Sequence, residues 1–467
     1  MAFVKKYDMI VVGAGSAGAS TAYHLASSGY DVALLEKKSM EQAGAKWVND
    51  IAPWMFDMAK LPRPESPEKR DDFKPFTMMS QNHQKRIQLP KRPLWGVDMR
   101  KLTKRLQSMA LNAGVTPYDH VEIIDLIFQG NRPSEIKISI SDSLSHKVFH
   151  TLKADLFIDA TGMKGELRQL MPAAKKLWPT IQPFDTCSAA QQVCFISDRS
   201  GAQAFLNKLN IPEDHFICFT GVQGGFSTKM FYIDEGFETV SILTGVLWDG
   251  HHGTGLDLIN QIKADHSWIG PIDFGGSGLI PIRRPFDQLG IEGIALIGDA
   301  ACQVFPAHGS GVGNGLIASY LLKESIQPFH DPGSQEAIDA YQQAFHRYRG
   351  AYCAAYEIFS RMSRDMSEND IYQMIHNGWL SSTSVHACLD QLLPSLSIKD
   401  TMQAIQSFIQ SPFMGMMLLS NLLKMVMSYG LYSLYPKHSQ SIFFNMWSQC
   451  ARIASQDKFW YSSKKSS

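Results

Sequence analysis

The hydrophobic pattern at the start of the chain predicts a strand, a helix and a second strand. Residues 7–12 form a short apolar, β-branched run that ends at Gly13, which is typical of a buried parallel strand. Apolar residues then recur at helical spacing over residues 17–27, and a second apolar run covers residues 31–35. Parallel strands joined by a helix are the unit from which α/β folds are built, so we expect an α/β protein.

The pattern continues along the chain. Residues 100–113 match an amphipathic helix, whereas residues 177–278 mix short strand-like runs with glycine-rich turns. From residue 334 onward the pattern is predominantly helical. Further strands are expected at residues 121–128, 135–141, 147–152, 156–160, 193–196, 216–222, 239–246 and 294–297, and a helix at residues 311–326.

Composition and charge exclude some classes of function. A chain of 467 residues with 45% apolar and 19% charged residues has the composition of a folded, enzyme-sized protein. Its 44 Lys and Arg residues equal its 44 Asp and Glu residues, so it has no net basic charge to attract nucleic acid. We therefore expect no nucleic-acid partner, and the oligomeric state is left open.

The cysteines and the N-terminus bear on the cellular compartment. The seven cysteines are scattered, without the CxxC or Cys/His spacing of a metal site, so we expect buried thiols and no metal. The apolar run at residues 9–12 is too short for a signal peptide. These features predict a cytoplasmic protein, with peripheral membrane contact as an open alternative.

A glycine-rich turn lies between the first strand and the first helix, with the sequence Gly13-Ala14-Gly15-Ser16-Ala17-Gly18. Gly13 permits a tight turn, Gly15 lets the backbone approach a pyrophosphate, and Gly18 lets the helix pack closely on the strand. Glu36 ends the second strand and is placed to accept hydrogen bonds from ribose hydroxyls. The turn predicts a dinucleotide site but does not choose between FAD and NAD.

A second glycine-rich motif lies far along the chain. Residues 297–301, followed by Pro306, Gly309 and Gly311, resemble the second flavin signature of the para-hydroxybenzoate hydroxylase and geranylgeranyl reductase superfamily. The resemblance implies an FAD cofactor, with Asp299 at its ribityl chain and the backbone of residues 306–313 beside the isoalloxazine. A helix N-terminus at this place suits an anionic reduced flavin.

A third motif, Asp159-Ala160-Thr161-Gly162 followed by Arg168, resembles the middle flavin motif of the same superfamily, and residues 155–159 are similar to flavin-dependent halogenases. Residues 95–100 resemble the segment that places an arginine near the FAD phosphates, which nominates Arg100; a solvated arginine at the helix cap is the alternative. The predicted cofactor-binding residues are Gly13, Gly15, Ser16, Ala17, Gly18, Glu36, Lys37, Arg100, Gly162, Gly298, Asp299, Pro306, Gly309, Gly311 and Val312.

Together these motifs predict an FAD-binding Rossmann-like domain, an inserted mixed-sheet substrate domain and a helical C-terminal region. We assign residues 1–60, 95–175 and 280–333 to the first, residues 61–94 and 176–279 to the second, and residues 334–467 to the third. No second dinucleotide motif follows a strand, so reduced nicotinamide, NAD(P)H, would bind transiently as electron donor, or another protein would deliver the electrons.

The motifs do not identify the reaction. Residues 224–231 fall where geranylgeranyl reductases carry an aromatic-Trp-Phe-Pro stretch and halogenases a Trp-x-Trp-x-Ile-Pro stretch, and neither stretch is intact. Halogenases also need a lysine for hypohalous acid, for which the sequence offers Lys46, Lys60, Lys69, Lys74 and Lys85. We expect an FAD-dependent oxidoreductase on an apolar or aromatic small molecule, either a geranylgeranyl-reductase-like reductase or a monooxygenase. A halogenase and a non-redox, carotenoid-cyclase-like isomerase are the alternatives.

Two further features concern the substrate. His308, inside the flavin-facing loop, is our candidate acid or base, although a loop histidine that bonds backbone is the more ordinary interpretation. Cys302 is interpreted as a packed thiol, and His251 and His252 as solvent-facing. Residues 413–435 are almost continuously apolar and rich in methionine, so we expect a helical cap that packs on the soluble body without spanning a bilayer, over a pocket for a hydrophobic substrate.

Overall fold

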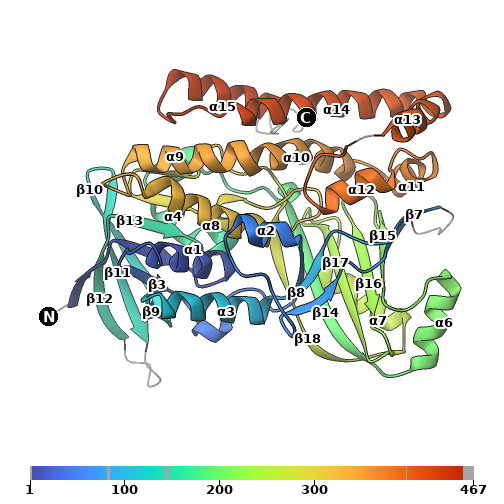
Figure 1. The fold of residues 1–467 in the computed structure, drawn as a ribbon, viewed down its shortest axis with the longest axis horizontal. Helices are drawn as coiled ribbons and strands as arrows, with labels where there is room; N and C mark the ends of the chain where they lie inside the picture. Colours follow the sequence, from blue (N-terminus) through green and yellow to red (C-terminus); the bar gives the residue numbers. More distant parts are fainter. Residues whose placement is uncertain (1–2, 81–84, 142–146, 396, 456–467) are drawn as a thin grey trace.

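The computed structural model describes residues 3–80, 85–141, 147–395 and 397–455 of the chain (Figure 1). A six-stranded sheet in the order β19-β20-β13-β2-β3-β9 carries the N-terminal strand-helix-strand unit. All of its pairs are parallel except β19 with β20. Its strands are β2 (Met9–Val12), β3 (Val32–Leu35), β9 (Thr116–Tyr118), β13 (Leu156–Asp159), β19 (Gly290–Ile291) and β20 (Ile294–Leu296).

The apolar runs of the sequence explain this sheet. Every residue of β2, β3 and β13 is buried, as expected for parallel strands covered on both faces. One cover is helical, where α1 packs between α3 and α8. The other includes a four-stranded sheet in the order β1-β12-β11-β10. The elements of these two covers are α1 (Ser16–Ala26), α3 (Met99–Asn112), α8 (Val312–Ile326), β1 (Phe3–Lys6), β10 (Val121–Gln129), β11 (Arg132–Ser141) and β12 (Lys147–Lys153).

A seven-stranded sheet forms the other half of the molecule, in the order β18-β14-β17-β16-β15-β6-β7 (Figure 1). Only its β15–β6 pair is parallel. The strands are β6 (Phe76–Met79), β7 (Arg86–Leu89), β14 (Thr186–Ile196), β15 (His215–Thr220), β16 (Thr228–Ile233), β17 (Thr239–Leu247) and β18 (Ile269–Pro281). Two helices accompany this sheet, α6 (Arg199–Leu209) and α7 (Gly255–Asp265).

A small sheet joins the two halves. It has the order β4-β8-β5, and its strands are β4 (Val48–Ile51), β5 (Lys69–Asp72) and β8 (Trp95–Asp98). The amide of Val48 donates a 2.6 Å hydrogen bond to Oε1 of Gln191 on β14, which ties the small sheet to the large one. Short helices complete these regions: α2 (Pro53–Met58), α4 (Glu166–Leu170), α5 (Ala174–Leu177), η1 (Met40–Gln42), η2 (Gly162–Lys164), η3 (Pro183–Asp185) and η4 (Gly298–Ala301).

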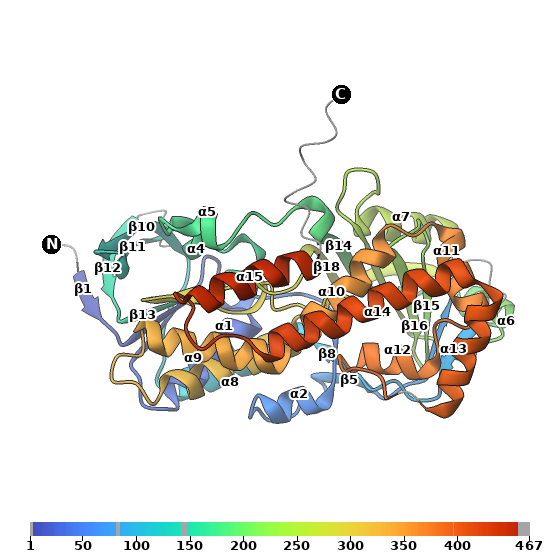
Figure 2. The same ribbon diagram turned by 90° about the horizontal axis from the view of Figure 1, so that it is seen from above.

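The C-terminal region is helical, as predicted, up to residue 455; residues 456–467 lie outside the described residues. Helices α9 and α10 lie across the body, and α13, α14 and α15 form the outermost layer above them (Figures 1 and 2). The helices are α9 (Gln335–Phe345), the π-helical turn η5 (His346–Gly350), α10 (Ala351–Arg364), α11 (Glu368–His376), α12 (Ser382–Leu389), α13 (Ile398–Gln410), α14 (Pro412–Ser433) and α15 (Ile442–Ala454).

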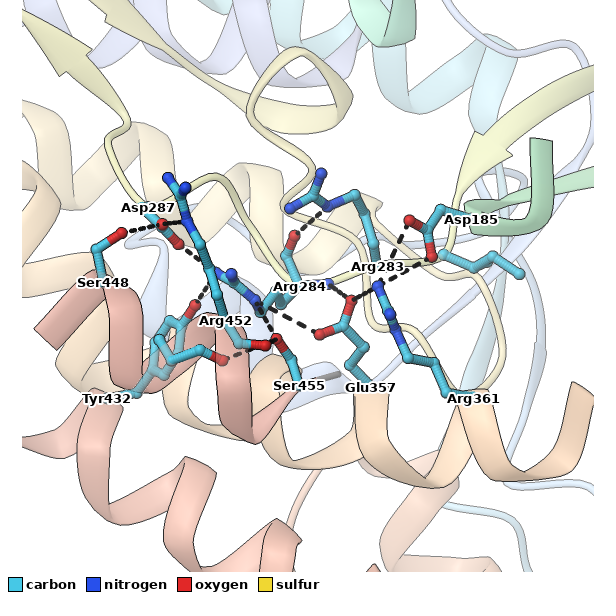
Figure 3. A network of polar contacts seen from close by, with 12 residues as sticks. Asp185, Arg283, Arg284, Asp287, Glu357, Arg361, Tyr432, Ser448, Arg452 and Ser455 are labelled. Carbon is cyan, nitrogen blue, oxygen red and sulfur yellow. Dashed lines mark hydrogen bonds and ion pairs between the residues drawn. The ribbon is translucent and has the colours of Figure 1, made fainter. Parts of the chain in front are cut away.

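A buried polar network fastens this outer layer to the body (Figure 3). Arg284, in the loop between β18 and β19, donates hydrogen bonds to the hydroxyl of Tyr432 on α14 at 2.6 Å and to Oγ of Ser455 at 3.1 Å. Asp287 accepts from Ser448 of α15 at 2.5 Å.

These sheets and helices confirm the predicted fold class: a mixed α/β protein with a Rossmann-like N-terminal region, mixed sheets and a helical C-terminal region.

Candidate cofactor groove and substrate cavity

A groove of about 380 Å³ lies at the carboxyl ends of β2, β13 and β20, where a parallel sheet ordinarily binds its ligand. The glycine turn forms its floor. Gly13 has a φ of 101°, and a Cβ there would lie 2.3 Å from the carbonyl oxygen of Ala160. A Cβ at Gly18 would lie 1.8 Å from the carbonyl oxygen of Gly13. Both glycines are therefore required for the close approach of α1 to β2 and β13.

Gly15 plays a different part. A Cβ there would meet only the backbone of Gly44, at 3.6 Å and 3.9 Å, so the space beside Gly15 belongs to the groove. No side chain caps the N-terminus of α1 and its first turn has no acidic residue, so the N–H groups there are available to an anion. Gly13, Gly15, Ser16 and Ala17 all line the groove, whereas Gly18 acts beneath it, in helix packing.

Glu36 and Lys37 lie in the groove wall at the end of β3. The two carboxylate oxygens of Glu36 accept from the backbone N–H groups of Ala14, at 2.9 Å, and Lys38, at 3.0 Å. These bonds fix the carboxylate beside the glycine turn, and each oxygen keeps a lone pair for a ligand hydroxyl. Lys37 forms an ion pair with Glu166 at 3.3 Å, and both residues line the groove.

Asp299 lies in the opposite wall, in η4. Burial raises the pKa of its carboxyl group to about 6. Its side chain is partly exposed in the groove and bonds no side chain or backbone group among the described residues, so its oxygens are available to a ligand hydroxyl. Gly298 beside it has a φ of 67° and also lines the groove, as do Gly162, Gly309, Gly311 and Val312.

The second glycine motif, like the first, begins a helix without a side-chain cap and leaves no room for a side chain at close contacts. Gly311 caps α8 without a side-chain hydrogen bond, and a Cβ at Gly311 would lie 2.8 Å from Val304 and 3.1 Å from Oδ1 of Asp299. Gly309 has a φ of 75°, which favours glycine. Pro306 is buried and lies outside the walls of both the groove and the cavity described below.

Two arginines of the motifs do not face the groove. Arg100 lies outside its wall, because its guanidinium bonds the helix cap Asp98 at 2.6 and 3.0 Å and lies over Phe274. The geometry thus matches the alternative interpretation of Arg100 as a helix-cap arginine. Arg168 is buried and donates to the carbonyl oxygen of Ala300 at 2.7 Å, while Asp159 accepts from the Arg168 amide at 2.8 Å. The middle motif thus holds the β13 turn against η4.

A second, larger cavity of about 610 Å³ adjoins the groove. It lies between the seven-stranded sheet and α10, α12 and α14, and its wall is mainly apolar. Groove and cavity share four wall residues, which are Trp47, Asn49, Ile280 and Gly309. A ligand in the groove and one in the cavity would therefore meet at these four residues.

Of the four residues at this junction, only Gly309 was predicted from the sequence. Trp47 lies over the backbone of β18: a Cβ at Gly276 or Gly278 would be 3.2 or 3.3 Å from its ring. The glycines of β18 thus make room for the indole. The sequence after Trp47 is rich in aromatic and methionine residues, but it has no clear period that would mark a site.

His308 lines the cavity, and its ring lies 4.9 Å from that of Phe305. Burial lowers the pKa of His308 to about 4, so the imidazole is neutral at ordinary pH. Its Nε2 has no hydrogen-bond partner among the described residues. Because Nε2 has almost no accessible surface, the ring contributes a neutral surface to the cavity wall, and its role as acid or base stays a prediction.

The remaining chemistry-bearing side chains are less reactive. Burial raises the pKa of the Cys302 thiol to about 11, which matches a packed thiol. His252 is paired with Asp249 at 2.9 Å and is only partly exposed, so its interpretation as solvent-facing is corrected. Within the described part of the chain no lysine lines the cavity. Lys46, Lys69, Lys74 and Lys85 bond Glu41, Asp72, Asp214 and His376, respectively, and Lys60 is exposed.

Fold and groove together define a dinucleotide-binding flavoprotein. The FAD dependent oxidoreductase family model matches residues 8–59, which contain the glycine turn and Glu36. The digeranylgeranylglycerophospholipid reductase of Sulfolobus acidocaldarius is 23% identical over 387 residues, 78% of this chain and 79% of the relative. A reductase of the same name from Methanopyrus kandleri is 23% identical over 77% of this chain and 88% of its own.

Solved structures share the whole architecture. A geranylgeranyl bacteriochlorophyll reductase-like protein from Thermoplasma acidophilum superposes with a TM-score of 0.69 over 90% of this chain and 100% of its own, at 15% identity. A flavin-dependent brominase superposes with a TM-score of 0.58 over 87% of this chain and 100% of its own, at 14% identity. The chain is therefore similar in sequence to FAD-dependent oxidoreductases, and it shares its fold with solved structures of a geranylgeranyl reductase-like protein and of flavin-dependent halogenases.

Proposed function

We propose that this protein is an FAD-dependent reductase that saturates carbon–carbon double bonds in a long, apolar lipid of the isoprenoid class. The observation that carries the proposal is the junction of the groove with a large apolar cavity at Trp47, Asn49, Ile280 and Gly309. The named activity of the archaeal relatives, the reduction of geranylgeranyl lipids, agrees with such a cavity.

The residues of the groove suit FAD. The uncapped N-terminus of α1 and the space at Gly15 suit a pyrophosphate, Glu36 suits a ribose, and Asp299 supplies an unpaired acceptor for a ribityl hydroxyl. When bound and reduced, FAD supplies the two electrons that saturation of a double bond requires, and NAD(P)H or a partner protein would reduce it. These residues would hold the cofactor with its reactive end toward the shared wall.

The cavity residues orient and shield the substrate. The polar groups of the wall are few and largely engaged, as in the 2.6 Å ion pair of Arg92 with Asp50 and the Gln191 bond to Val48. The wall therefore selects for apolar chains and excludes water from the junction. Neutral His308 is one of the titratable side chains of the cavity wall and stays our candidate acid or base.

A halogenase is less well supported, because the cavity wall offers no lysine among the described residues. The test is to reduce the FAD-loaded protein without oxygen and add a geranylgeranyl phospholipid in detergent. We expect products heavier by two hydrogen atoms for each bond reduced, and none with the Gly15→Val variant. Incorporation of labelled oxygen after admission of ¹⁸O₂ would indicate a monooxygenase, and an isomer of unchanged mass would indicate the non-redox alternative.

A further inference from the structure

The outer layer of the C-terminal region exposes an unusual number of apolar side chains. We call these residues the apolar face. They lie on α13, α14 and α15 and at Leu434 just after α14, and these helices form the outermost layer of the molecule (Figures 1 and 2). The apolar face consists of Ile398, Met402, Ile405, Phe408, Ile409, Phe413, Met416, Leu419, Leu422, Leu423, Val426, Met427, Leu434, Ile442, Phe443, Met446 and Ile453.

Helix α13 has its apolar and polar sides reversed. Its apolar stripe of Ile398, Met402, Ile405 and Ile409 points outward, and Ile398 and Ile409 are 85% and 73% exposed. Ser407 is the one residue of this helix that is buried. A surface helix of a soluble protein ordinarily buries its apolar stripe, so folding of this chain does not account for the arrangement.

Helix α14 is apolar on both sides. Its inner side packs on α10, where Met414 and Tyr432 are buried. Its outer side carries Phe413, Leu423 and Val426, which are 81%, 59% and 63% exposed. The helix has the length and composition of a membrane span, but only 17% of the relevant stretch is buried in the protein.

Buried polar bonds argue that α14 lies on the body and does not leave it to cross a bilayer. Its Tyr432 bonds Arg284, and Asp287 bonds Ser448 on α15, the helix that packs beside α14 (Figure 3). Breaking these bonds inside hydrocarbon would leave polar groups without partners. The layer therefore presents its apolar face while it stays attached along its inner side.

The charge of this layer favours an anionic partner. Between Ser397 and Ser455 the basic residues are Lys399, Lys424, Lys437 and Arg452, and the only acidic residue is Asp400. The chain as a whole is balanced, with 44 basic and 44 acidic residues. An apolar helical face with a basic excess is the composition of elements that bind the surface of anionic membranes.

The apolar face is also continuous with the substrate cavity. Leu393, Leu422 and Val426 are exposed, and all three contribute to the cavity wall, together with Met425 and Tyr429. An apolar chain could therefore pass between the apolar face and the cavity over hydrophobic surface.

We infer that the apolar face docks on the surface of a lipid bilayer that contains anionic phospholipid, with α13, α14 and α15 in the plane of the interface. The cavity wall at Leu422 and Val426 then faces the lipid, and the substrate enters from the bilayer. The docking does not depend on the proposed reductase activity, because it follows from the surface alone. The substrate route does rest on that proposal.

The first experiment is flotation of the FAD-loaded full chain with phosphatidylcholine vesicles, with and without phosphatidylglycerol. We expect binding to the anionic vesicles, weakened severalfold by high salt. The triple variant Ile405→Gln, Ile409→Gln, Phe413→Gln should lose at least about tenfold in partitioning. The matched control, Val148→Gln, Phe149→Gln, Phe195→Gln, alters residues of comparable exposure elsewhere and should bind as the unaltered chain does.

Both variants are checked for retained flavin absorbance and thermal unfolding. Equal partitioning of the two triple variants would overturn the docking surface, and equal binding to neutral vesicles would overturn its anionic preference. A chain that binds no vesicles but forms dimers that the first variant dissociates would show that a second copy covers this face. Because no substrate or turnover is involved, failure here leaves the reductase test untouched.

Depth of insertion gives a second readout. An environment-sensitive fluorophore at Leu423→Cys, in a Cys450→Ser background, should shift to shorter wavelength on addition of anionic vesicles, whereas one at Phe149→Cys should not. Bromines near the headgroup end of the acyl chain should quench it more than bromines at the bilayer centre. Stronger quenching from the centre, or extraction by detergent alone, would mean that α14 spans the membrane and would overturn the inference.

Discussion

Arg284 donates a 2.6 Å hydrogen bond to the hydroxyl of Tyr432, and both side chains are fully buried. The same guanidinium forms ion pairs with Asp287 and Glu357 (Figure 3). One cation therefore connects three parts of the chain: the loop that follows β18, helix α10 and helix α14. Burial alone would raise the pKa of Asp287, but Arg284 and the hydroxyl of Ser448 outweigh it and hold that pKa below its ordinary value.

Arg284→Met should therefore destabilise the protein. The substitution removes the main counter-charge of buried Asp287 and one of the two arginines paired with Glu357, the other being Arg361. Loss of one partner from such a buried cluster costs about 3–5 kcal/mol. Urea unfolding measures the total effect, and hydrogen exchange should show α14 and α15 opening first. Arg452→Met is the control, because Arg452 also bonds Asp287 but is 56% exposed in its side chain and should cost less than about 1 kcal/mol. Equal losses in the two variants would contradict this view of the network.

Gly15→Val should abolish FAD binding and leave the fold intact. The backbone at Gly15 has a φ of −66°, which valine adopts readily, and the nearest atom to its Cβ would be 3.6 Å away. The extra methyl groups would fill the groove where the pyrophosphate is expected. Flavin content after reconstitution is the measurement, with Gly430→Ala as the control since a Cβ there meets nothing within 4 Å. Normal flavin content in folded Gly15→Val protein would refute the assignment.

FAD affinity should depend on pH through Asp299. Its carboxyl group has a pKa of about 6 before a ligand binds, and a ligand hydroxyl that donates to it favours the ionised form. Affinity should therefore rise with pH up to about 6, by no more than about tenfold per pH unit, and level off above. Titration of the flavin-free protein by fluorescence quenching measures this. Asp299→Asn should bind more weakly and without the slope; the same slope in both proteins would show that another group titrates.

The sequence predicts those parts of the site whose residues are close together in the chain. The glycine turn and Glu36 could be found because strand, turn and helix are adjacent in the chain. Arg100 shows the limit of a local motif, because its bonds to Asp98 and its position over Phe274 come from the fold and match the helix-cap alternative. The junction of Trp47 with Ile280 unites residues from distant parts of the chain, and no local pattern reports such a meeting.

The C-terminal helices show a second limit. Periodicity reveals that Ile398, Met402, Ile405 and Ile409 share one side of α13, but it does not reveal which side faces solvent. Helix α14 does cover the cavity, since Met425 and Tyr429 line it and α14 packs along α10, whereas its role as a cap over a substrate stays a prediction. That the apolar stripe of α13 points toward solvent could be learned only from the structure.

Stability should fall as the pH drops below about 6.5 through three buried histidines with lowered pKa values, His24, His308 and His346, of which His346 is the one chosen for substitution. This ring is buried and stacked 4.4 Å from Tyr435, and burial lowers its pKa to about 3. Between the two pKa values the unfolded chain binds a proton that the folded chain does not, so stability decreases by up to about 1.4 kcal/mol per pH unit. Urea unfolding at several pH values from 7.5 to 4.5 gives the slope. His346→Phe keeps a stacked ring and should make the slope shallower; an unchanged slope would assign the effect to other groups.

Met425→Trp should block the cavity without disturbing the groove. Met425 lies on the inner side of α14 and in the cavity wall, so a larger ring there takes volume from the space of about 610 Å³ that an apolar chain would occupy. Leu423→Trp is the matched control on the same helix, because Leu423 is 59% exposed and lies outside the cavity wall. Both variants should keep full flavin content.

The measurement for this pair is binding of a detergent-solubilised geranylgeranyl lipid to the FAD-loaded protein, followed by the change in flavin absorbance that a ligand at the shared wall would cause. Met425→Trp should weaken the response at least about fivefold, since overpacking of a filled site costs about 1–3 kcal/mol. Leu423→Trp should respond as the unaltered chain does, because its ring points away from the cavity. Equal responses from both variants would mean that the lipid does not occupy the space beneath α14, and the substrate site would then have to lie outside this cavity.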